Sequence, residues 1–341
     1  MTVVASMRHN VKRDTLVRAR WRDYTTPMIA NMPCPKTPLR IGTRGSPLAL
    51  AQAHETRDRL AQAFDLPDAA FEVVVIKTTG DRIQDRPLRE IGGKGLFTRE
   101  IEQDLLSGTI DIAVHSMKDM PVLQPKGLVL STYLPREDVR DALICPTASS
   151  LNDLPAGALV GTSSLRRKAQ VLLRRPDLSV VEFRGNLQTR LKKLNAGVAR
   201  CTFLAMAGLN RLQMTEIAAM PVAPEEMLPA VAQGAIGIEQ RVDDSRCSAL
   251  LAAIDHRPTG VLLAAERAFL AGLNGSCETP IAGLATRDGG QVLLRGEILR
   301  PDGSEHLYDA QSAPVEDVAA LGAEMAAKLR ELAGPQFFEL P

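Results

Sequence analysis

The 341-residue chain has few aromatic residues, almost no net charge and no long apolar run. Phe, Trp and Tyr make up 4% of it, so its cores have to be built from Leu, Ile, Val and Ala. The net charge of +1 gives no general reason to expect binding to nucleic acid or to a membrane surface. No apolar run approaches the roughly 20 residues of a membrane-spanning helix. We therefore expect a soluble protein of two or three domains with neither nucleic acid nor membrane as a partner.

Cysteine is scarce as well, and its five positions form no motif: they are Cys34, Cys145, Cys201, Cys247 and Cys277. The odd count, the wide spacing and the lack of CxxC argue against a disulfide framework and against a zinc site. We expect a reducing compartment, the cytoplasm, and no metal. Cys277 lies in a polar loop, whereas Cys145, Cys201 and Cys247 lie within or beside an apolar run or a helix. Such a loop cysteine, taken alone, is more often incidental than functional.

The first 36 residues form a basic segment that differs from the rest of the chain. They contain seven Lys or Arg residues and two Asp residues, a net charge of +5, so the remainder carries −4. The segment lacks the apolar stretch of a secretory signal. It fits a disordered leader, an organellar transit peptide, or a start codon placed too far upstream, since Met28 and Met32 lie close to the regular pattern. All three interpretations stay open.

From Leu39 onward, strand-like and helix-like segments alternate twice. We expect strands at 39–42, 71–77, 110–115, 159–161, 179–183 and 201–206. We expect helices that begin at Ser46–Pro47, span 97–107 and 164–174, and begin at Asn186. This alternation predicts parallel sheets with helices on both faces, arranged as two α/β lobes with a cleft between them. Ligands of such sheets bind beyond the carboxyl ends of the strands.

After about residue 257 the pattern changes to that of a small α+β domain. A helix is expected over 259–272, followed by the polar loop 273–280. Three strand-like runs near 281–287, 291–299 and 305–310 are separated by the hairpin signals Asp288-Gly-Gly and Pro301-Asp-Gly. A closing helix over 315–333 completes an antiparallel sheet with helices against it.

Two arginines occupy an unusual position at the start of the first helix of the second lobe, expected over 164–174. Arg166 and Arg167 fall in its first turn, where the helix dipole favours negative charge. Two cations at this place predict an anion-binding site. The alternative, that they pair with Asp or Glu from elsewhere in the chain, stays open.

Other cations recur at comparable strand-to-helix turns, often beside glycine: Arg44, Lys94, Arg184, Arg190 and Arg211. None is specific alone, but together they fit a cleft for a ligand with several negative groups. The Gly92-Gly-Lys-Gly95 run lacks the spacing of a phosphate loop, which argues against a nucleotide site.

A polar turn follows the expected strand at 110–115. It contains His115, Ser116, Lys118 and Asp119 and projects an acid and a base toward the cleft, or else it simply turns the chain at the surface.

Seven motifs in this order make the chain resemble the porphobilinogen deaminase family: TRGSPLALAQA, GGKGLF, DIAVHSMKDMP, GTSSLRR, FRGN with TR following, LPAVAQGAIGIE and LNGSCETPI. The resemblance runs from about Leu39 to beyond residue 290. It implies two periplasmic-binding-protein-like lobes and a third domain. Domain 1 would comprise 37–135 and 233–256, domain 2 residues 136–232, and domain 3 residues 257–341.

The resemblance also implies the chemistry. The enzyme joins four porphobilinogen molecules head to tail, with loss of ammonia, and releases hydroxymethylbilane. Growth takes place on one dipyrromethane primer, which the protein builds from its own substrate and holds through a thioether to Cys277. A monomer without metal is expected.

The family motifs place roles on individual residues of this chain. Asp119 would be the catalytic carboxylate, which stabilises positive charge on the pyrrole nitrogens. The cofactor would contact Cys277, Ser116, Lys118, Asp119, Thr162, Ser163, Arg166, Arg167, Arg184 and Gly185. The substrate would contact Arg44, Ser46, Arg184, Arg190, Arg211 and Gln233. Lys94 and Phe97 would belong to a lid. One departure is Arg200, where the family commonly has an acidic residue, and we expect no loss of activity from it.

Two other functions compete with this interpretation. A non-catalytic binding protein for a small polycarboxylate would share the two lobes but leave Cys277 and the third domain without a purpose. A Cys-dependent hydrolase or transferase would need a histidine near Cys277, with His54, His115, His256 and His306 as candidates.

Overall fold

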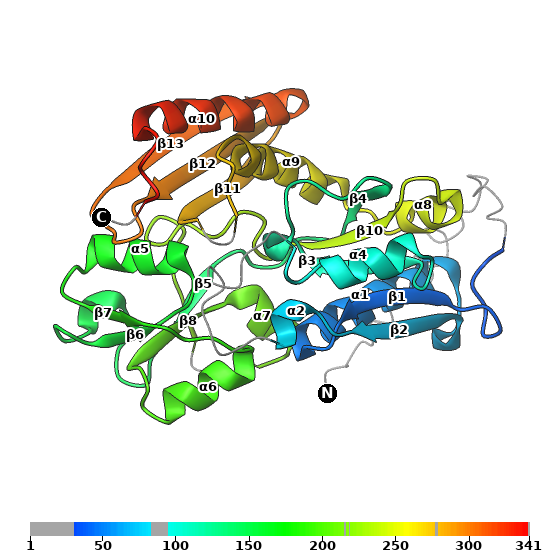
Figure 1. The fold of residues 1–341 in the computed structure, drawn as a ribbon, viewed down its shortest axis with the longest axis horizontal. Coiled ribbons are helices and arrows are strands. Elements are labelled where there is room, and N and C mark those ends of the chain that lie inside the picture. The colour runs from blue at the N-terminus through cyan, green and yellow to red at the C-terminus, as the bar shows by residue number, and fades with distance from the viewer. Residues whose placement is uncertain (1–30, 83–94, 215, 218, 277–278, 340–341) are drawn as a thin grey trace, which may run out of the picture. The chain divides into compact units, whose positions relative to one another are not determined.

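The computed structural model describes residues 31–82, 95–214, 216–217, 219–276 and 279–339. Most of the expected leader lies outside these residues, as do Lys94 and Cys277. Residues Pro33–Pro341 belong to one compact unit. None of its described helices combines the length and the apolar character needed to span a membrane. The unit is built on three sheets (Figure 1).

The first sheet has five strands in the order β2-β1-β3-β10-β4. They are β1 Leu39–Arg44, β2 Phe71–Ile76, β3 Ile112–Ser116, β4 Leu128–Tyr133 and β10 Ile236–Arg241. The helices of this part are α1 Pro47–Phe64, α2 Thr79–Arg82, α4 Arg99–Leu106 and α8 Ser245–Ala252. The expected N-terminal cap of α1 is confirmed, because the Ser46 side chain accepts a hydrogen bond from the Ala49 amide.

The second sheet also has five strands, in the order β7-β6-β8-β5-β9. They are β5 Asp141–Ile144, β6 Leu159–Gly161, β7 Ser179–Val181, β8 Cys201–Ala205 and β9 Ala219–Pro221. The helices of this part are α5 Leu165–Arg174, α6 Leu187–Asn195 and α7 Met206–Arg211. Asn186 caps α6 as expected, accepting a hydrogen bond from the Thr189 amide.

The two α/β lobes are confirmed, but the expectation of parallel sheets holds for only part of each larger sheet. β1 runs parallel to β2 and β3, and β6 runs parallel to β7 and β8. In contrast, β10 is antiparallel to β3 and β4, and β5 is antiparallel to β8 and β9. The cause is the path of the chain: it leaves the first sheet after β4 and returns to it as β10, so segments that cross between the sheets add strands of opposite direction.

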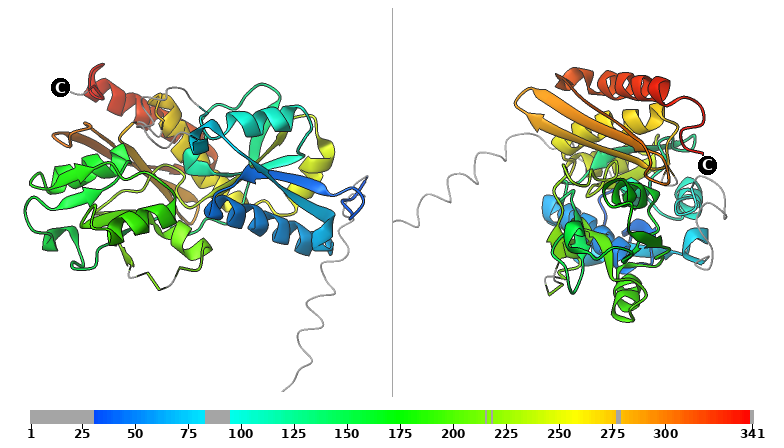
Figure 2. Two further views of the ribbon diagram at one scale, coloured as in Figure 1. Left: turned by 60° about the horizontal axis from the view of Figure 1, so that its bottom comes forward. Right: turned by 90° about the vertical axis from the view of Figure 1, so that its left-hand side faces the viewer.

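The third sheet is an antiparallel meander, β11-β12-β13, with bounds Ile281–Asp288, Gln291–Leu299 and His306–Pro314. Helix α9 spans Arg257–Gly272 and α10 spans Val318–Ala333, and both pack on this sheet (Figure 2). The α+β expectation for this region is confirmed. The two helices pack closely at Gly322, where a side chain would collide with the Ala265 carbonyl oxygen. Short 3-10 turns complete the fold at Asp68–Ala70, Met117–Asp119 (η2), Leu151–Asp153 and Val315–Asp317.

One buried carboxylate joins α9 to the segments that cross between the two five-stranded sheets. Glu266 is fully buried and pairs with Arg136 through two contacts of 2.6 and 3.0 Å. It also accepts the Ala232 amide at 2.6 Å and the Ala285 amide at 2.8 Å. Four elements therefore depend on this one side chain.

We predict that Glu266→Ala lowers the free energy of unfolding by about 3–5 kcal/mol, because the Arg136 charge and two amides lose their buried partner. Glu324→Ala, at an exposed site on α10, is the matched control and should change stability little. Denaturant unfolding measures both variants. Equal stabilities would show that Glu266 does not hold these elements together.

Candidate functional site

The polar turns at the carboxyl ends of β1 and β3 contribute to one pocket. Arg44, Ser46, Ser116 and Asp119 line it, together with Phe97. Asp119 is the last residue of the 3-10 turn η2 and is exposed, so a ligand in the pocket has access to its carboxylate. The structure thus gathers five of the residues that the sequence assigned to the site.

Within this pocket Arg44 already has two partners. Its guanidinium forms an ion pair with Asp81 at 2.5 Å and lies 4.1 Å from the centre of the Phe97 ring. The Ser116 hydroxyl is held by the side-chain amide of Gln52, with contacts of 2.8 and 3.0 Å. The pocket is therefore ordered by contacts within the protein.

Lys118, next to Asp119, lies near cations on α5 and α6, the helices that accompany the second sheet. It is partly buried, and desolvation lowers the pKa of its ammonium to about 8. The charges of Arg167 and Arg190 act in the same direction as desolvation, whereas those of Asp119 and Asp141 oppose this shift of the pKa.

Desolvation and the charges of Arg167 and Asp119 act on the pKa of Arg190 as they do on that of Lys118. Desolvation first, and the charge of Arg167 second, lower the pKa of its guanidinium to about 10, and Arg184 acts in the same direction. Asp119 and Glu182 oppose the shift. We call Lys118, Arg167, Arg184 and Arg190 the cation cluster. The charges of Arg167 and Arg190 act on Lys118, and those of Arg167 and Arg184 act on Arg190, so the cluster favours the entry of an anionic ligand.

The arginine pair at the start of α5 is anchored by a buried acid. Arg166 contacts Asp141 at 2.7 Å and Arg167 contacts it at 2.6 Å. Burial alone would raise the pKa of Asp141, but the charges of the two arginines hold it well below its ordinary value. The alternative that these arginines pair with an acid from elsewhere is confirmed. Among the described residues, the Nε atoms of both are buried without a hydrogen-bond partner.

The two hydroxyls expected to contact the cofactor, those of Thr162 and Ser163, accept hydrogen bonds from backbone amides. Thr162 Oγ1 accepts the Ser164 amide at 3.2 Å, and Ser163 Oγ accepts the Phe183 amide at 3.0 Å. Gly185 has a φ of +120°, and a Cβ there would lie 2.6 Å from the Thr189 side chain. Glycine is therefore required for the tight turn between β7 and α6.

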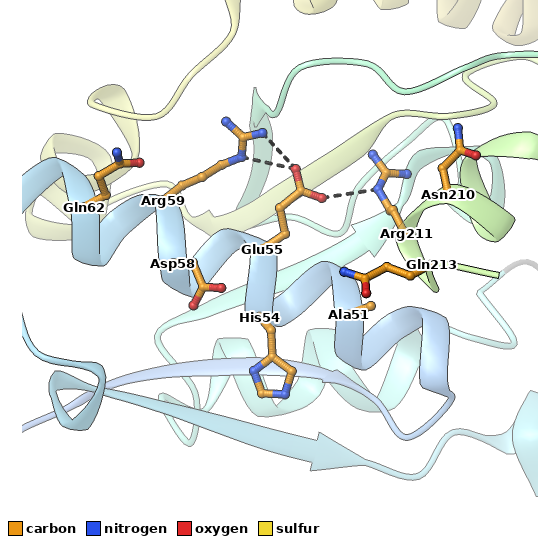
Figure 3. Close-up of a pocket in the computed structure, with 9 residues that line it drawn as sticks. All are labelled: Ala51, His54, Glu55, Asp58, Arg59, Gln62, Asn210, Arg211 and Gln213. Carbon is orange, nitrogen blue, oxygen red and sulfur yellow. Dashed lines mark hydrogen bonds and ion pairs between the residues drawn. The ribbon is translucent and has the colours of Figure 1, made fainter. Parts of the chain in front are cut away.

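Arg211 lies in a different pocket from Asp119. Its Nε contacts Glu55 at 3.3 Å (Figure 3). Its NH2 donates to the Gly234 carbonyl at 3.0 Å. This second pocket lies between α1 and α7 and is lined by Ala51, His54, Glu55, Asp58, Arg59, Gln62, Asn210, Arg211 and Gln213 (Figure 3).

Gln233 is another expected substrate contact that does not line the pocket at Asp119. It is 1% exposed, and its amide donates to the Val139 carbonyl at 2.8 Å and to Asp141 at 2.9 Å. Sequence reasoning missed Asp141 itself. The available signal was an aspartate at the start of an apolar strand, in Val139-Arg-Asp-Ala-Leu-Ile144.

The histidines have other partners. His115 is buried against Glu239 at 3.2 Å, His256 caps α9, and His306 contacts Glu297 at 2.9 Å. In the part of the chain that the structure describes, no group of three His, Cys, Asp or Glu side chains is placed to hold a metal ion.

The electrostatic arrangement at Lys118 predicts a titration with a defined sign. In a Cys277→Ala chain, which cannot carry a thioether-linked group, the Lys118 pKa should lie near 8. Arg190→Gln should raise it by removing a repelling charge, and Asp119→Asn should lower it by removing an attracting one. NMR titration of ¹³C-methylated lysines measures these values. Arg200→Gln, at an exposed position, is the control that should leave the value unchanged, and a shift of opposite sign for either site variant would contradict the arrangement.

Comparison with known proteins gives matches over most of the chain. The family model "Porphobilinogen deaminase, dipyromethane cofactor binding domain" matches residues 39–249. The model "Porphobilinogen deaminase, C-terminal domain" matches residues 261–331. The chain is 63% identical to the porphobilinogen deaminase of Paracoccus denitrificans over 311 residues, which cover 91% of this chain and 99% of that protein. It is 56% identical to that of Nitrobacter winogradskyi over 300 residues, 88% of this chain and 95% of the relative.

Solved structures give much weaker likenesses. The Bordetella pertussis BvgS periplasmic VFT2 domain has a TM-score of 0.38 and 13% identity, covering 63% of this chain and 86% of that one. The methionine-binding protein MetQ has the same score and identity, covering 63% of this chain and 89% of that one. These values are too low to support an argument, and the α/β architecture rests on the sheets described above. The two family models and the long, closely similar relatives show that the chain belongs to the porphobilinogen deaminase family.

Proposed function

We propose that the pocket at Asp119 and the cation cluster form the active site in which this protein joins four porphobilinogen molecules head to tail. Ammonia is released and hydroxymethylbilane is the product, which is the activity of the family to which the chain belongs. The observation that carries the assignment is the pocket at the exposed Asp119, which Arg44, Ser46 and Ser116 also line, with Lys118 and Arg190 near enough for the Asp119 charge to act on them. Each pyrrole of the chain under construction bears an acetate and a propionate, so a cationic cleft matches the charge of the substrate.

The residues present fit a dipyrromethane, the cofactor bound by the matched family domain. Two observations support the fit: the mutual repulsion within the cation cluster, and the buried Nε donors of Arg166 and Arg167 that lack a partner. We assign its binding to Cys277, through a thioether, and to Ser116, Lys118, Asp119, Thr162, Ser163, Arg166, Arg167, Arg184 and Gly185. When bound, the dipyrromethane supplies the free α-carbon onto which each new pyrrole unit is added.

Asp119 stabilises the positive charge that develops on a pyrrole nitrogen. Its carboxylate accepts the pyrrole N–H, and its negative charge offsets the positive charge that develops there. The short turn η2, directly after β3, places Asp119 at the carboxyl end of that strand.

The cations bind and orient the carboxylate side chains of the substrate. Arg190 uses its Nε on the Gly185 carbonyl at 3.0 Å, which fixes the guanidinium and leaves its terminal nitrogens for a ligand. Arg44 and Ser46 line the Asp119 pocket and would contact the incoming unit, with Phe97 and Lys94 as parts of a lid. For Arg211 and Gln233 the contacts with Glu55 and Asp141 favour a supporting role.

We further propose the domain division 37–135 with 233–256, 136–232, and 257–341, preceded by the leader 1–36. Its support is that β10 pairs within the first sheet, β5–β9 form the second and β11–β13 form the third. A monomer in the cytoplasm remains our prediction, as does the absence of nucleic acid, membrane and metal. The described cysteines Cys34, Cys145, Cys201 and Cys247 are free thiols, which suits a reducing compartment.

The mass of the intact protein tests the anchor of the cofactor. Cys277→Ala should lack the mass of two linked pyrrole units that the wild type carries, because no thioether can form. Cys34→Ala, which removes a partly exposed cysteine, should retain this mass. A retained primer in Cys277→Ala would exclude Cys277 as the anchor, and continued absence of any adduct after incubation of the wild type with porphobilinogen would favour a polycarboxylate-binding protein.

Turnover tests the catalytic carboxylate. Asp119→Ala should lower kcat by at least about 10²–10³-fold, the loss typical when one preorganised electrostatic group is removed. The fold should be kept, because Asp119 is exposed. Asp243→Ala, another exposed aspartate, is the control that should turn over normally. Ammonia release from porphobilinogen measures both, and an unchanged kcat in Asp119→Ala would remove Asp119 from its role.

A further inference from the structure

Asp141 is the point on which the second lobe's arginine pair and a crossing segment converge. It is fully buried at the start of β5. One carboxylate oxygen accepts from Arg166 NH2 at 2.7 Å. The other accepts from Arg167 NH2 at 2.6 Å and from the Gln233 amide at 2.9 Å.

Each guanidinium is held at a second point by a backbone carbonyl. Arg166 NH1 donates to the Leu228 carbonyl at 2.8 Å, and Arg167 NH1 donates to the Phe203 carbonyl at 2.8 Å. A planar group fixed by two terminal nitrogens has a determined orientation. Asp141 therefore decides the direction in which the remaining N–H groups of both arginines point.

Each of the two arginines keeps one unused donor. Both Nε atoms are buried and lack a partner among the described residues, an arrangement that costs free energy unless a ligand provides an acceptor. The charge of Arg167 also lowers the pKa values of Lys118 and Arg190, so Arg167 lies near both of these cations.

We infer that Asp141 is a positioning residue for the elongation reaction: it holds Arg166 and Arg167 so that their remaining N–H groups face the carboxylates of the growing pyrrole chain. The inference rests on the proposed role of the two arginines in the site. Asp141 acts through them and does not touch the pyrroles.

Charge and position predict opposite effects, and this separates the inference from a purely electrostatic role. Asp141→Asn keeps the side-chain shape but removes one negative charge, which makes the net charge of the site more positive. Charge alone would therefore tighten carboxylate binding. If Asp141 sets the orientation of the guanidiniums, the same variant weakens binding, because an asparagine amide group cannot accept from both arginines.

The experiment compares Asp141→Asn with Asp177→Asn, a matched control whose aspartate pairs with Arg175 away from the site. Both are assayed well below their unfolding temperatures. Asp141→Asn should raise the KM for porphobilinogen about tenfold or more, the size expected when a charge-assisted hydrogen bond is misplaced. The intact-mass distribution after substrate addition should shift toward chains with fewer added pyrrole units, and the control should match the wild type.

Three results decide the matter. A folded Asp141→Asn with an unchanged or lower KM and a normal mass distribution would overturn the inference. If Asp141→Asn does not fold, Gln233→Met replaces it. This variant removes one hydrogen bond from Asp141, keeps both ion pairs and should raise the KM by a smaller factor. An unchanged KM would again overturn the inference. Arg167→Gln is measured alongside: normal KM and elongation in that variant would refute the proposed role of the arginines, whereas impairment there with a normal Asp141→Asn would refute only the positioning role.

Discussion

The structure depends on the way it balances buried positive charge between its two five-stranded sheets. Arg166 and Arg167 begin a helix, where the dipole disfavours them, and both are 4% exposed. The single carboxylate of Asp141 makes this arrangement stable, but it supplies one negative charge for two positive ones. With Lys118 and Arg190 close by, the site retains excess positive charge. A ligand that brings several carboxylates completes the balance, and the pyrrole substrates of this family have that composition.

The same network ties binding to the architecture. Gln233, in the segment that returns to the first sheet, donates to Asp141, and its own carbonyl accepts from Arg136 at 2.9 Å. Arg136 in turn pairs with Glu266 on α9, the helix that leads toward the Cys277 loop. A continuous chain of buried polar contacts therefore links the arginine pair, both crossing segments and the third domain.

The sequence predicts the local helices, strands and turns of this protein well. It predicts poorly which distant side chains and strands pair with one another. The β-branched run at 71–77, the Ser46-Pro47 helix start and the hairpin glycines near 289 and 303 act over a few residues, so their outcome is encoded locally. The acid that pairs with Arg166 lies 25 positions away, and only the antiparallel placement of β5 beside β8 brings it there. The pairing of Arg211 with Glu55 spans 156 positions and depends on how α1 and α7 meet. For the same reason, the antiparallel strands in both larger sheets could not be predicted from strand–helix alternation.

The most direct test of the account is a crystal structure of the protein carrying its covalent primer. The account predicts that acetate and propionate oxygens of the primer lie within hydrogen-bond distance of Arg167 and of other members of the cation cluster. Asp141 should stay paired with both arginines, and Asp119 should face the pyrrole nitrogens. A primer whose carboxylates face solvent, with the cation cluster paired only to acids of the protein, would contradict the claim that this charge is arranged for the pyrrole chain.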